Sequence, residues 1–112
     1  MSKIIQAEAG NQSLKGKCLV GRVILNRVES GSNNTIKSVV FANRNGIYQF
    51  SPIKDGRYFS SIPTNECYQA IDMLSFGWDE SQGAQYFCNG KSEWHNNNLQ
   101  ILFKEGDHVF YK

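Results

Sequence analysis

The chain has 112 residues, of which 40% are hydrophobic and 20% are charged, which suits one domain built around a single packed core. Its formal net charge is +2, and this is too small for a nucleic-acid-binding surface. No apolar run approaches the about 20 residues of a membrane-spanning helix. We therefore predict a single domain over residues 1–112, a monomer that binds no nucleic acid and spans no membrane.

The three cysteines, Cys18, Cys67 and Cys88, are widely spaced and form no Cys-x-x-Cys motif. An odd number at such spacing favours neither a disulfide framework nor a structural zinc site, and we expect no metal and no cofactor. The first residues lack the apolar stretch and the cleavage site of a signal peptide. If the protein acts outside the cytoplasm, we expect something other than a signal peptide to deliver it.

The first two predicted elements are helices. Residues 4–9 are typical of a short helix that ends at Gly10. A longer helix is predicted over residues 13–28, because apolar or small residues recur there on one helical face. These residues are Leu14, Cys18, Gly21, Leu25 and Val28, with Val20 and Ile24 beside them.

Two residues of the longer helix carry further expectations. Gly21 costs about 1 kcal/mol relative to alanine, which predicts the close approach of another backbone. Lys17 is predicted to point away from the buried face. Residues 30–34 are rich in Ser, Gly and Asn, and they are predicted to end the helix in a turn.

A third helix is predicted over residues 35–41, with Ile36, Val39 and Val40 directed inward. Residues 43–63 contain several aromatic side chains but little periodicity. This pattern predicts a long surface loop, and such a loop in a small domain is usually functional.

A fourth helix is predicted to follow Pro63-Thr64 and to end at Gly77, with Cys67, Ile71 and Leu74 on its buried face. Residues from Ala84 onward alternate in polarity over short stretches, which predicts short strands. The polar run 95–98 is interpreted as an exposed turn. The fold class predicted from this order is mainly α, an α+β domain with a few short strands.

Several motifs follow one another along the chain in a recognisable order. They are Ile-Gln-Ala-Glu-Ala-Gly at 5–10, Val-Ile-Leu-Asn-Arg-Val at 23–28, Gln-Phe-Ser-Pro at 49–52, Gly-Ala-Gln-Tyr-Phe-Cys-Asn at 83–89 with Trp94, and His-Val-Phe-Tyr at 108–111. Together they cover nearly the whole chain and resemble the SleB/CwlJ cell wall hydrolase family, which includes spore-cortex-lytic enzymes. One departure is Gly90, since the family usually has proline after this asparagine.

The resemblance implies a small lysozyme-like or resuscitation-factor-like catalytic domain that cleaves the MurNAc–GlcNAc bond in the glycan strands of bacterial peptidoglycan. It further implies that Glu8 is the catalytic acid and base. The place of action would be the bacterial cell wall or the spore cortex, reached through spore assembly, a phage or a partner protein.

Glu8 stands between two alanines, which leave room for a sugar beside its carboxyl group. Burial among apolar groups would raise its pKa above the usual value of about 4.3, so that it keeps its proton near neutral pH. Taken alone, a glutamate in this position is more often a solvated residue at a helix end. The resemblance reverses that balance in favour of catalysis.

A glycosidase that works by retention or inversion needs a second carboxylate. The available acids are Asp55, Asp72, Asp79, Glu80, Glu93 and Asp107, and none lies in a motif built for this role. A lytic transglycosylase needs only one acid, because the 6-hydroxyl of the muramic acid replaces the attacking water. We therefore predict a lytic transglycosylase that leaves 1,6-anhydro-MurNAc ends, while a hydrated product stays open at this point.

Sugars present both apolar faces and hydroxyl groups, so their sites combine rings with polar side chains. The predicted substrate-binding residues are Gln49, Phe50, Ser51, Tyr86, Asn89, Trp94 and Tyr111. Tyr86 is expected to hydrogen-bond either the Glu8 carboxyl group or the substrate's N-acetyl group. Asn26 is predicted to brace the site from behind, and His108 is predicted to be a structural histidine bonded to backbone.

Three alternative functions remain at this stage. A zinc-dependent N-acetylmuramoyl-L-alanine amidase would take three ligands from His95, His108, Cys88 and an acid. A cysteine peptidase would use Cys88 as nucleophile and His108 as base. A non-catalytic glycan-binding module would use the aromatic segments alone.

Overall fold

A computed structural model describes residues 1–31 and 35–112 of the chain. The helices are α1 (Ser2–Ala9), α2 (Leu14–Ser30), α3 (Ile36–Val40), α4 (Ser51–Asp55), α5 (Arg57–Ser60), α6 (Asn65–Ser75) and α7 (Glu93–Asn98). The strands are β1 (Asn43–Arg44), β2 (Ile47–Tyr48), β3 (Tyr86–Cys88), β4 (Ile101–Glu105) and β5 (His108–Tyr111). The predicted mainly α class with a few short strands is confirmed.

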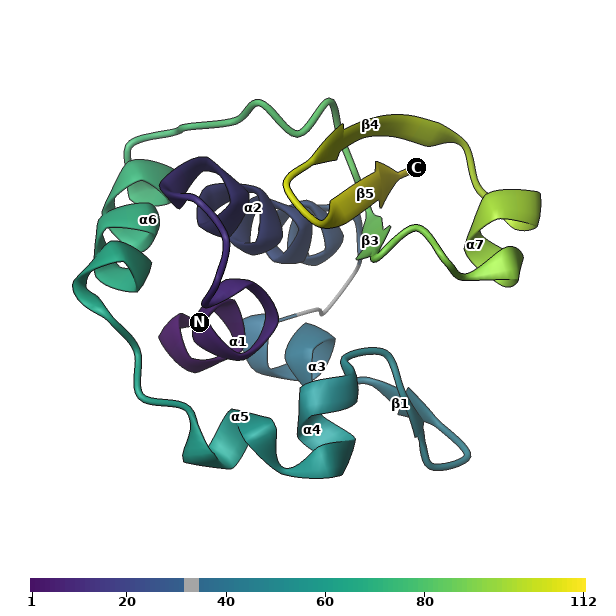
Figure 1. Ribbon diagram of the computed structural model, residues 1–112, viewed down its shortest axis with the longest axis horizontal. Coiled ribbons are helices and arrows are strands. Elements are labelled where there is room, and N and C mark those ends of the chain that lie inside the picture. The colour runs from purple at the N-terminus through teal and green to yellow at the C-terminus, as the bar shows by residue number, and fades with distance from the viewer. Residues whose placement is uncertain (32–34) are drawn as a thin grey trace.

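Helix α2 lies at the centre, and α1, α3 and α6 pack against it (Figure 1). It begins after Ser13, whose hydroxyl accepts a hydrogen bond from the Gly16 backbone N–H at 3.1 Å. Because elements surround it, α2 buries Leu19 and Val23 in addition to the predicted Cys18. The helix itself is confirmed. Of its predicted closing turn, residues 32–34 lie outside the described part of the chain.

Two expectations about α2 are wrong in detail. Lys17 does not point to solvent: its buried ammonium group donates to the Gln12 carbonyl at 2.6 Å and pairs with Glu66 at 3.0 Å. At Gly21 a Cβ atom would lie 2.5 Å from the Leu74 Cδ1 atom of α6. The glycine therefore admits a neighbouring side chain, where the sequence predicted a neighbouring backbone.

The predicted surface loop over residues 43–63 is also wrong, since this segment contains a hairpin and two short helices. Strands β1 and β2 pair antiparallel around Asn45-Gly46, whose φ angles are +56° and +80°. Asn-Gly tolerates these left-handed conformations and is the preferred sequence for such two-residue turns. Helix α4 has Pro52 in its first turn and ends at Gly56, which has a φ of +86°.

Helices α3 and α6 agree with the prediction except on their apolar faces. Val39 and Val40 are buried, but Ile36 is 37% exposed because it lies in the first turn of α3, at the surface. In α6, Cys67 and Leu74 are buried as expected. Ala70 completes that face, while Ile71 is only half-buried.

The second half of the chain forms a three-stranded antiparallel sheet in the order β3-β5-β4. The register pairs Tyr86 with Tyr111 and Cys88 with Val109. Between β3 and β4 the run predicted as an exposed turn is helix α7, which begins after Ser92, a residue whose side chain accepts from the His95 N–H at 3.2 Å. A six-residue helix is too short to show a helical repeat of apolar residues.

The apolar core has two parts that meet at α2. One part packs Ile24 of α2 against residues of α1, α3 and α4, and the other packs Leu19 and Val23 against Phe110 of β5. The helical half and the sheet half thus share α2 as a common support. In the described ranges, no helix has both the length and the apolar content needed to cross a bilayer.

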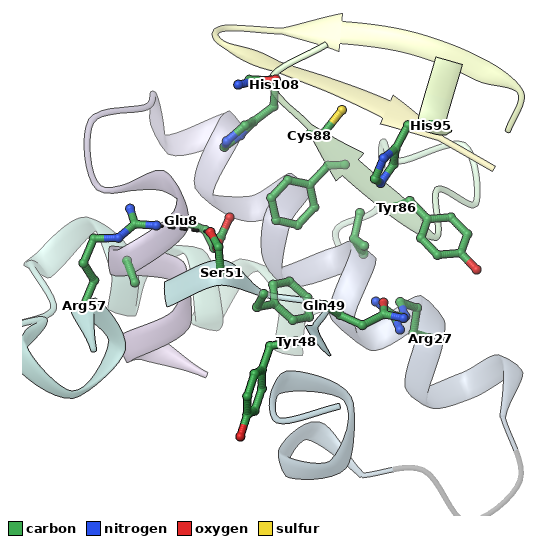
Figure 2. Close-up of a pocket in the computed structure, with 15 residues that line it drawn as sticks. Glu8, Arg27, Tyr48, Gln49, Ser51, Arg57, Tyr86, Cys88, His95 and His108 are labelled. Carbon is green, nitrogen blue, oxygen red and sulfur yellow. Dashed lines mark hydrogen bonds between the residues drawn. The ribbon is translucent and has the colours of Figure 1, made fainter. Parts of the chain in front are cut away.

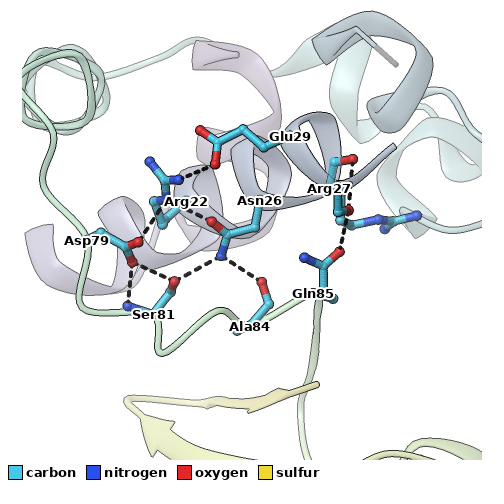
Figure 3. A network of polar contacts seen from close by, with 9 residues as sticks. Arg22, Asn26, Arg27, Glu29, Asp79, Ser81, Ala84 and Gln85 are labelled. Atoms are coloured by element: carbon cyan, nitrogen blue, oxygen red, sulfur yellow. Dashed lines mark hydrogen bonds and ion pairs between the residues drawn. The ribbon is translucent and has the colours of Figure 1, made fainter. Parts of the chain in front are cut away.

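A buried polar network fixes the segment that leads into β3 (Figure 3). The Asn26 side-chain amide donates to the Ser81 hydroxyl and to the Ala84 carbonyl, both at 2.9 Å, and its oxygen accepts from Arg22 Nε at 2.8 Å. Asp79 accepts from the Ser81 hydroxyl at 2.6 Å and closes the network. Because β3 follows directly, Asn26 holds the start of that strand against α2.

Candidate active site

A cavity of about 450 Å³ lies between the helical half and the sheet half. Its helical side comes from α1, the β2–α4 segment and α5, and its sheet side comes from β3, β5 and α7 (Figure 2). The lining residues are Ala7, Glu8, Val23, Arg27, Tyr48, Gln49, Phe50, Ser51, Arg57, Tyr86, Phe87, Cys88, Asn89, His95 and His108.

Glu8 is the sole acid among the described residues that line this cavity. It lies one helical turn after Ile4, which is fully buried, so its side chain starts on the buried side of α1. This burial raises the pKa of Glu8 from its usual 4.5 to about 7, while the positive charge of Arg57 lowers it and the negative charge of Asp55 raises it. A carboxyl group in this state can hold a proton at neutral pH and also accept one back.

The raised pKa of Glu8 predicts a stability effect that needs no substrate. As pH rises, the Glu8 carboxyl group loses its proton at a lower pH in the unfolded chain than in the folded protein. The free energy of unfolding therefore falls between about pH 4.5 and about pH 7, by up to about 3 kcal/mol. Glu8→Gln removes this loss. We expect the stability of Glu8→Gln relative to wild type to increase by about 2 kcal/mol between about pH 5 and about pH 8, measured by urea unfolding. A pH-independent difference would contradict the raised pKa.

Arg27 of α2 lies at the end of the cavity away from Glu8 (Figure 2). Its guanidinium carbon is 5.5 Å from the centre of the Tyr86 ring and 5.9 Å from that of Phe50, so it stacks over two rings of the lining. Burial lowers the pKa of this guanidinium, which nevertheless stays charged at neutral pH. Tyr86 is thus part of a cationic and aromatic end of the cavity.

Behind the sheet side, a chain of hydrogen bonds supports β3. The Cys88 thiol donates to the Tyr111 hydroxyl at 3.3 Å, and this hydroxyl donates to the Asn96 side chain at 2.7 Å. Cys88 is half-buried and lines the cavity, whereas Tyr111 is fully buried. Tyr111 therefore supports the cavity from behind, and its predicted place in direct contact with substrate is wrong.

His108 lies on β5 at the cavity, but not in the way predicted. Its buried Nδ1 atom has no hydrogen-bond partner among the described residues, so the expected bond to backbone is absent there. Its ring packs 5.0 Å from that of Phe87, centre to centre. Burial lowers the pKa of His108, which keeps the imidazole neutral at neutral pH.

A zinc site was one alternative that the sequence left open. His95, His108 and Cys88 all line the cavity. Within residues 1–31 and 35–112, however, no three His, Cys, Asp or Glu side chains are grouped so that they could hold a metal ion. His95 instead shares a hydrogen bond with Ser92, at 2.6 Å between Nδ1 and Oγ.

Comparison with known proteins identifies the family of this chain. A family model described as Cell Wall Hydrolase matches residues 11–111. The chain belongs to the cell wall hydrolase family. This confirms the resemblance seen in the sequence. The match begins three residues after Glu8, so that residue lies outside the matched range.

Relatives of this cell wall hydrolase extend the match to the whole chain. It is 32% identical to a spore cortex-lytic enzyme of Bacillus cereus and 30% identical to one of Oceanobacillus iheyensis, in both cases over all of this chain. The chain spans 42% and 40% of the lengths of these relatives.

Two solved structures share the fold. One is the catalytic domain of the germination-specific lytic transglycosylase SleB from Bacillus anthracis, with a TM-score of 0.83 and 30% identity over all of this chain and 90% of that domain. The other is the catalytic domain of the Bacillus cereus SleB protein, with a TM-score of 0.81, 30% identity, and coverage of all of this chain and 86% of that domain.

The structure of this cell wall hydrolase brings together most of the residues singled out from the sequence. Seven of them line the cavity: Glu8, Gln49, Phe50, Ser51, Tyr86, Asn89 and His108. Tyr86 and Glu8 lie on opposite sides, with the Tyr86 hydroxyl directed away from Glu8 (Figure 2). The expected contact between these two side chains is therefore not formed. Trp94 lies outside the lining on α7 and is 60% exposed.

Sequence reasoning missed Arg57 and Tyr48, which also line the cavity. The available signal for Arg57 was its place directly after Asp55-Gly56, where a helix stop turns the chain back toward the Gln-Phe-Ser-Pro motif. The signal for Tyr48 was the Asn-Gly turn, which brings β2 alongside that motif.

Proposed function

We propose that the chain is a peptidoglycan-cleaving lytic transglycosylase with Glu8 as its acid and base. The observation that carries the proposal is the place of Glu8, a half-buried carboxyl group and the sole acid among the described residues that line the cavity, and its burial raises its pKa to about 7. Membership of the cell wall hydrolase family and the likeness to a SleB lytic transglycosylase domain support the same reaction. The substrate is the glycan strand of bacterial peptidoglycan, cleaved at the MurNAc–GlcNAc bond.

The reaction uses the single carboxyl group of Glu8 twice, first as an acid and then as a base. In the first step the protonated carboxyl group gives its proton to the glycosidic oxygen, the bond from that oxygen to C1 of MurNAc breaks, and an oxocarbenium ion forms. In the second step the Glu8 carboxylate accepts the proton of the 6-hydroxyl group as that oxygen attacks C1. The product is a 1,6-anhydro sugar, no water is consumed, and Glu8 ends protonated as it began.

The other lining residues suit a sugar substrate. Gln49, Ser51 and Asn89 offer hydrogen-bonding groups, and Phe50 and Tyr86 offer ring faces. Trp94, exposed near this cavity on α7, remains a proposed contact for a longer glycan strand. His108 and Asn26 keep supporting roles in this proposal.

Product analysis tests this function. Purified cell walls and spore cortex peptidoglycan are each incubated with the protein in water enriched in heavy oxygen, and the released muropeptides are identified by mass spectrometry. We expect anhydro ends that carry no label from the water. A labelled reducing end would identify a hydrolase, free stem peptides would identify an amidase, and binding without any product would identify a glycan-binding module.

The natural setting is the second part of the proposal. The named relatives are spore cortex-lytic enzymes, so we infer that cortex peptidoglycan is the preferred of the two substrates. A higher rate of release from cortex than from vegetative cell walls, at equal glycan content, is the expected result. Equal or reversed rates would assign the enzyme to the vegetative cell wall.

A further inference from the structure

Arg57 lines the same cavity as Glu8 and is fixed there by three hydrogen bonds. Its Nε donates to Asp55 Oδ2 at 2.9 Å, its backbone N–H donates to Asp55 Oδ1 at 3.0 Å, and its Nη2 donates to the Ser51 hydroxyl at 3.2 Å. In Figure 2 the guanidinium extends from the edge of the cavity toward Glu8 and Ser51. A long, partly exposed side chain is thus held in one direction.

The reason for this geometry is local. Helix α4 ends at Gly56 in the left-handed conformation, and α5 begins with Arg57 immediately after it. The sharp reversal lets the Asp55 carboxylate accept both from the backbone and from the side chain of Arg57. Ser51, at the start of α4, then receives the far end of the guanidinium.

Helix α1, which carries Glu8, packs against α2, α4, α5 and α6. On α2 and α6, Lys17 and Glu66 neutralise each other in an ion pair, and Arg27 lies at the opposite end of the cavity. On α1 itself Lys3 lies 5.9 Å over the Tyr58 ring.

Of the charged groups near Glu8, the pair Arg57 and Asp55 remains. His108, from β5, is neutral at neutral pH because burial lowers its pKa. The charges that act on the Glu8 carboxyl group are those of Arg57, which favours the ionised form, and Asp55, which opposes it.

We propose that Arg57 is a positioning residue for the reaction: it stabilises the carboxylate that Glu8 becomes after giving up its proton, and Asp55 sets how strongly it does so. This inference rests on the proposed function of Glu8. A free guanidinium beside Glu8 would ionise it too early, whereas an apolar pocket alone would hold the proton too firmly. The Arg57–Asp55 pair keeps the proton affinity of the Glu8 carboxyl group between these two limits.

Two substitutions test the proposal in opposite directions. Arg57→Gln removes the positive charge, so the Glu8 pKa should rise. Asp55→Asn removes the negative charge while its side-chain oxygen can still accept from the Arg57 N–H, so the Glu8 pKa should fall. Glu8 must start protonated, and the alkaline limb of the pH profile of kcat/KM should therefore move up for Arg57→Gln and down for Asp55→Asn, each by about half a pH unit.

The same shifts are measured without substrate by NMR titration of the carboxyl carbon of Glu8 in the free protein. Both side chains are about half exposed, so about 1 M salt should bring the three titration midpoints together. Arg57→Lys, which keeps the charge, should restore most of the wild-type midpoint. Arg44→Gln, the same replacement in the exposed strand β1, is the matched control and should leave the midpoint unchanged.

The outcomes separate this inference from the function on which it rests. If Glu8→Gln keeps full activity, the proposed function fails. If Glu8 is required but its midpoint stays the same in Arg57→Gln and Asp55→Asn, or moves in the same direction in both, the role of Arg57 is refuted. Opposite shifts that collapse in high salt support it, because a purely structural contact would not produce them.

Discussion

Glu8→Gln is expected to lower the rate of glycan cleavage by about a thousandfold, within the range that a general acid and base contributes. The amide has the same shape as the carboxylic acid but cannot transfer the proton to the glycosidic oxygen. It should also leave the cavity intact, because the replacement adds no charge to a buried position. The measurement is the initial rate of muropeptide release from purified peptidoglycan.

Binding distinguishes loss of chemistry from loss of structure. Glu8→Gln should still sediment with insoluble peptidoglycan as wild type does, and its far-ultraviolet circular dichroism should be unchanged. Glu80→Gln is the matched control, since Glu80 is an exposed acid outside the cavity, and it should keep the full rate. A Glu8→Gln variant that cleaves within a few-fold of wild type would end the proposal of a single-carboxyl mechanism.

Asn26→Ala is expected to destabilise the fold by about 3 kcal/mol. The substitution removes three hydrogen bonds, those of the Asn26 side chain with the Ser81 hydroxyl, the Ala84 carbonyl and Arg22 Nε, and each contributes about 1 kcal/mol. The midpoint of thermal unfolding should fall by roughly 10 °C for a domain of this size. Urea and thermal unfolding at one pH provide the measurement.

The control for this experiment is an asparagine with no buried network. Asn97→Ala, on the exposed surface of α7, should change the stability by no more than about 0.5 kcal/mol. Ser81→Ala should have an intermediate effect, because the Asn26 amide keeps the Ala84 carbonyl as a partner. A loss below about 1 kcal/mol for Asn26→Ala would mean that water replaces the network and that β3 is held by other contacts.

The long helices could be predicted because burial imposes a repeat that the sequence displays. Helix α2 has 17 residues and α6 has 11, enough for several turns of apolar spacing. Helices α4 and α5 have five and four residues, and a single turn shows no period. The hairpin at Asn45-Gly46 is different: its turn chemistry is visible in the sequence, and the prediction of a loop overlooked it.

The candidate site was only partly accessible from the sequence. Gln49, Ser51 and Asn89 were chosen through the family resemblance, since residues from two distant segments show no common spacing. Arg57 was missed because its importance depends on where α5 places it relative to Glu8. Tyr111 was misplaced because an alternating pattern does not reveal which strand will be the central one of the sheet, and β5 is buried there.

The position of β5 also governs the order in which the molecule is assembled. It follows β3 and β4 in the chain yet lies between them, so neither earlier strand has a partner in the sheet until β5 has been synthesised. Helices α1 and α2 bring only one side of the cavity together before that point. We therefore expect a chain truncated before His108 to leave β3 and β4 unpaired and the cavity incomplete on its sheet side.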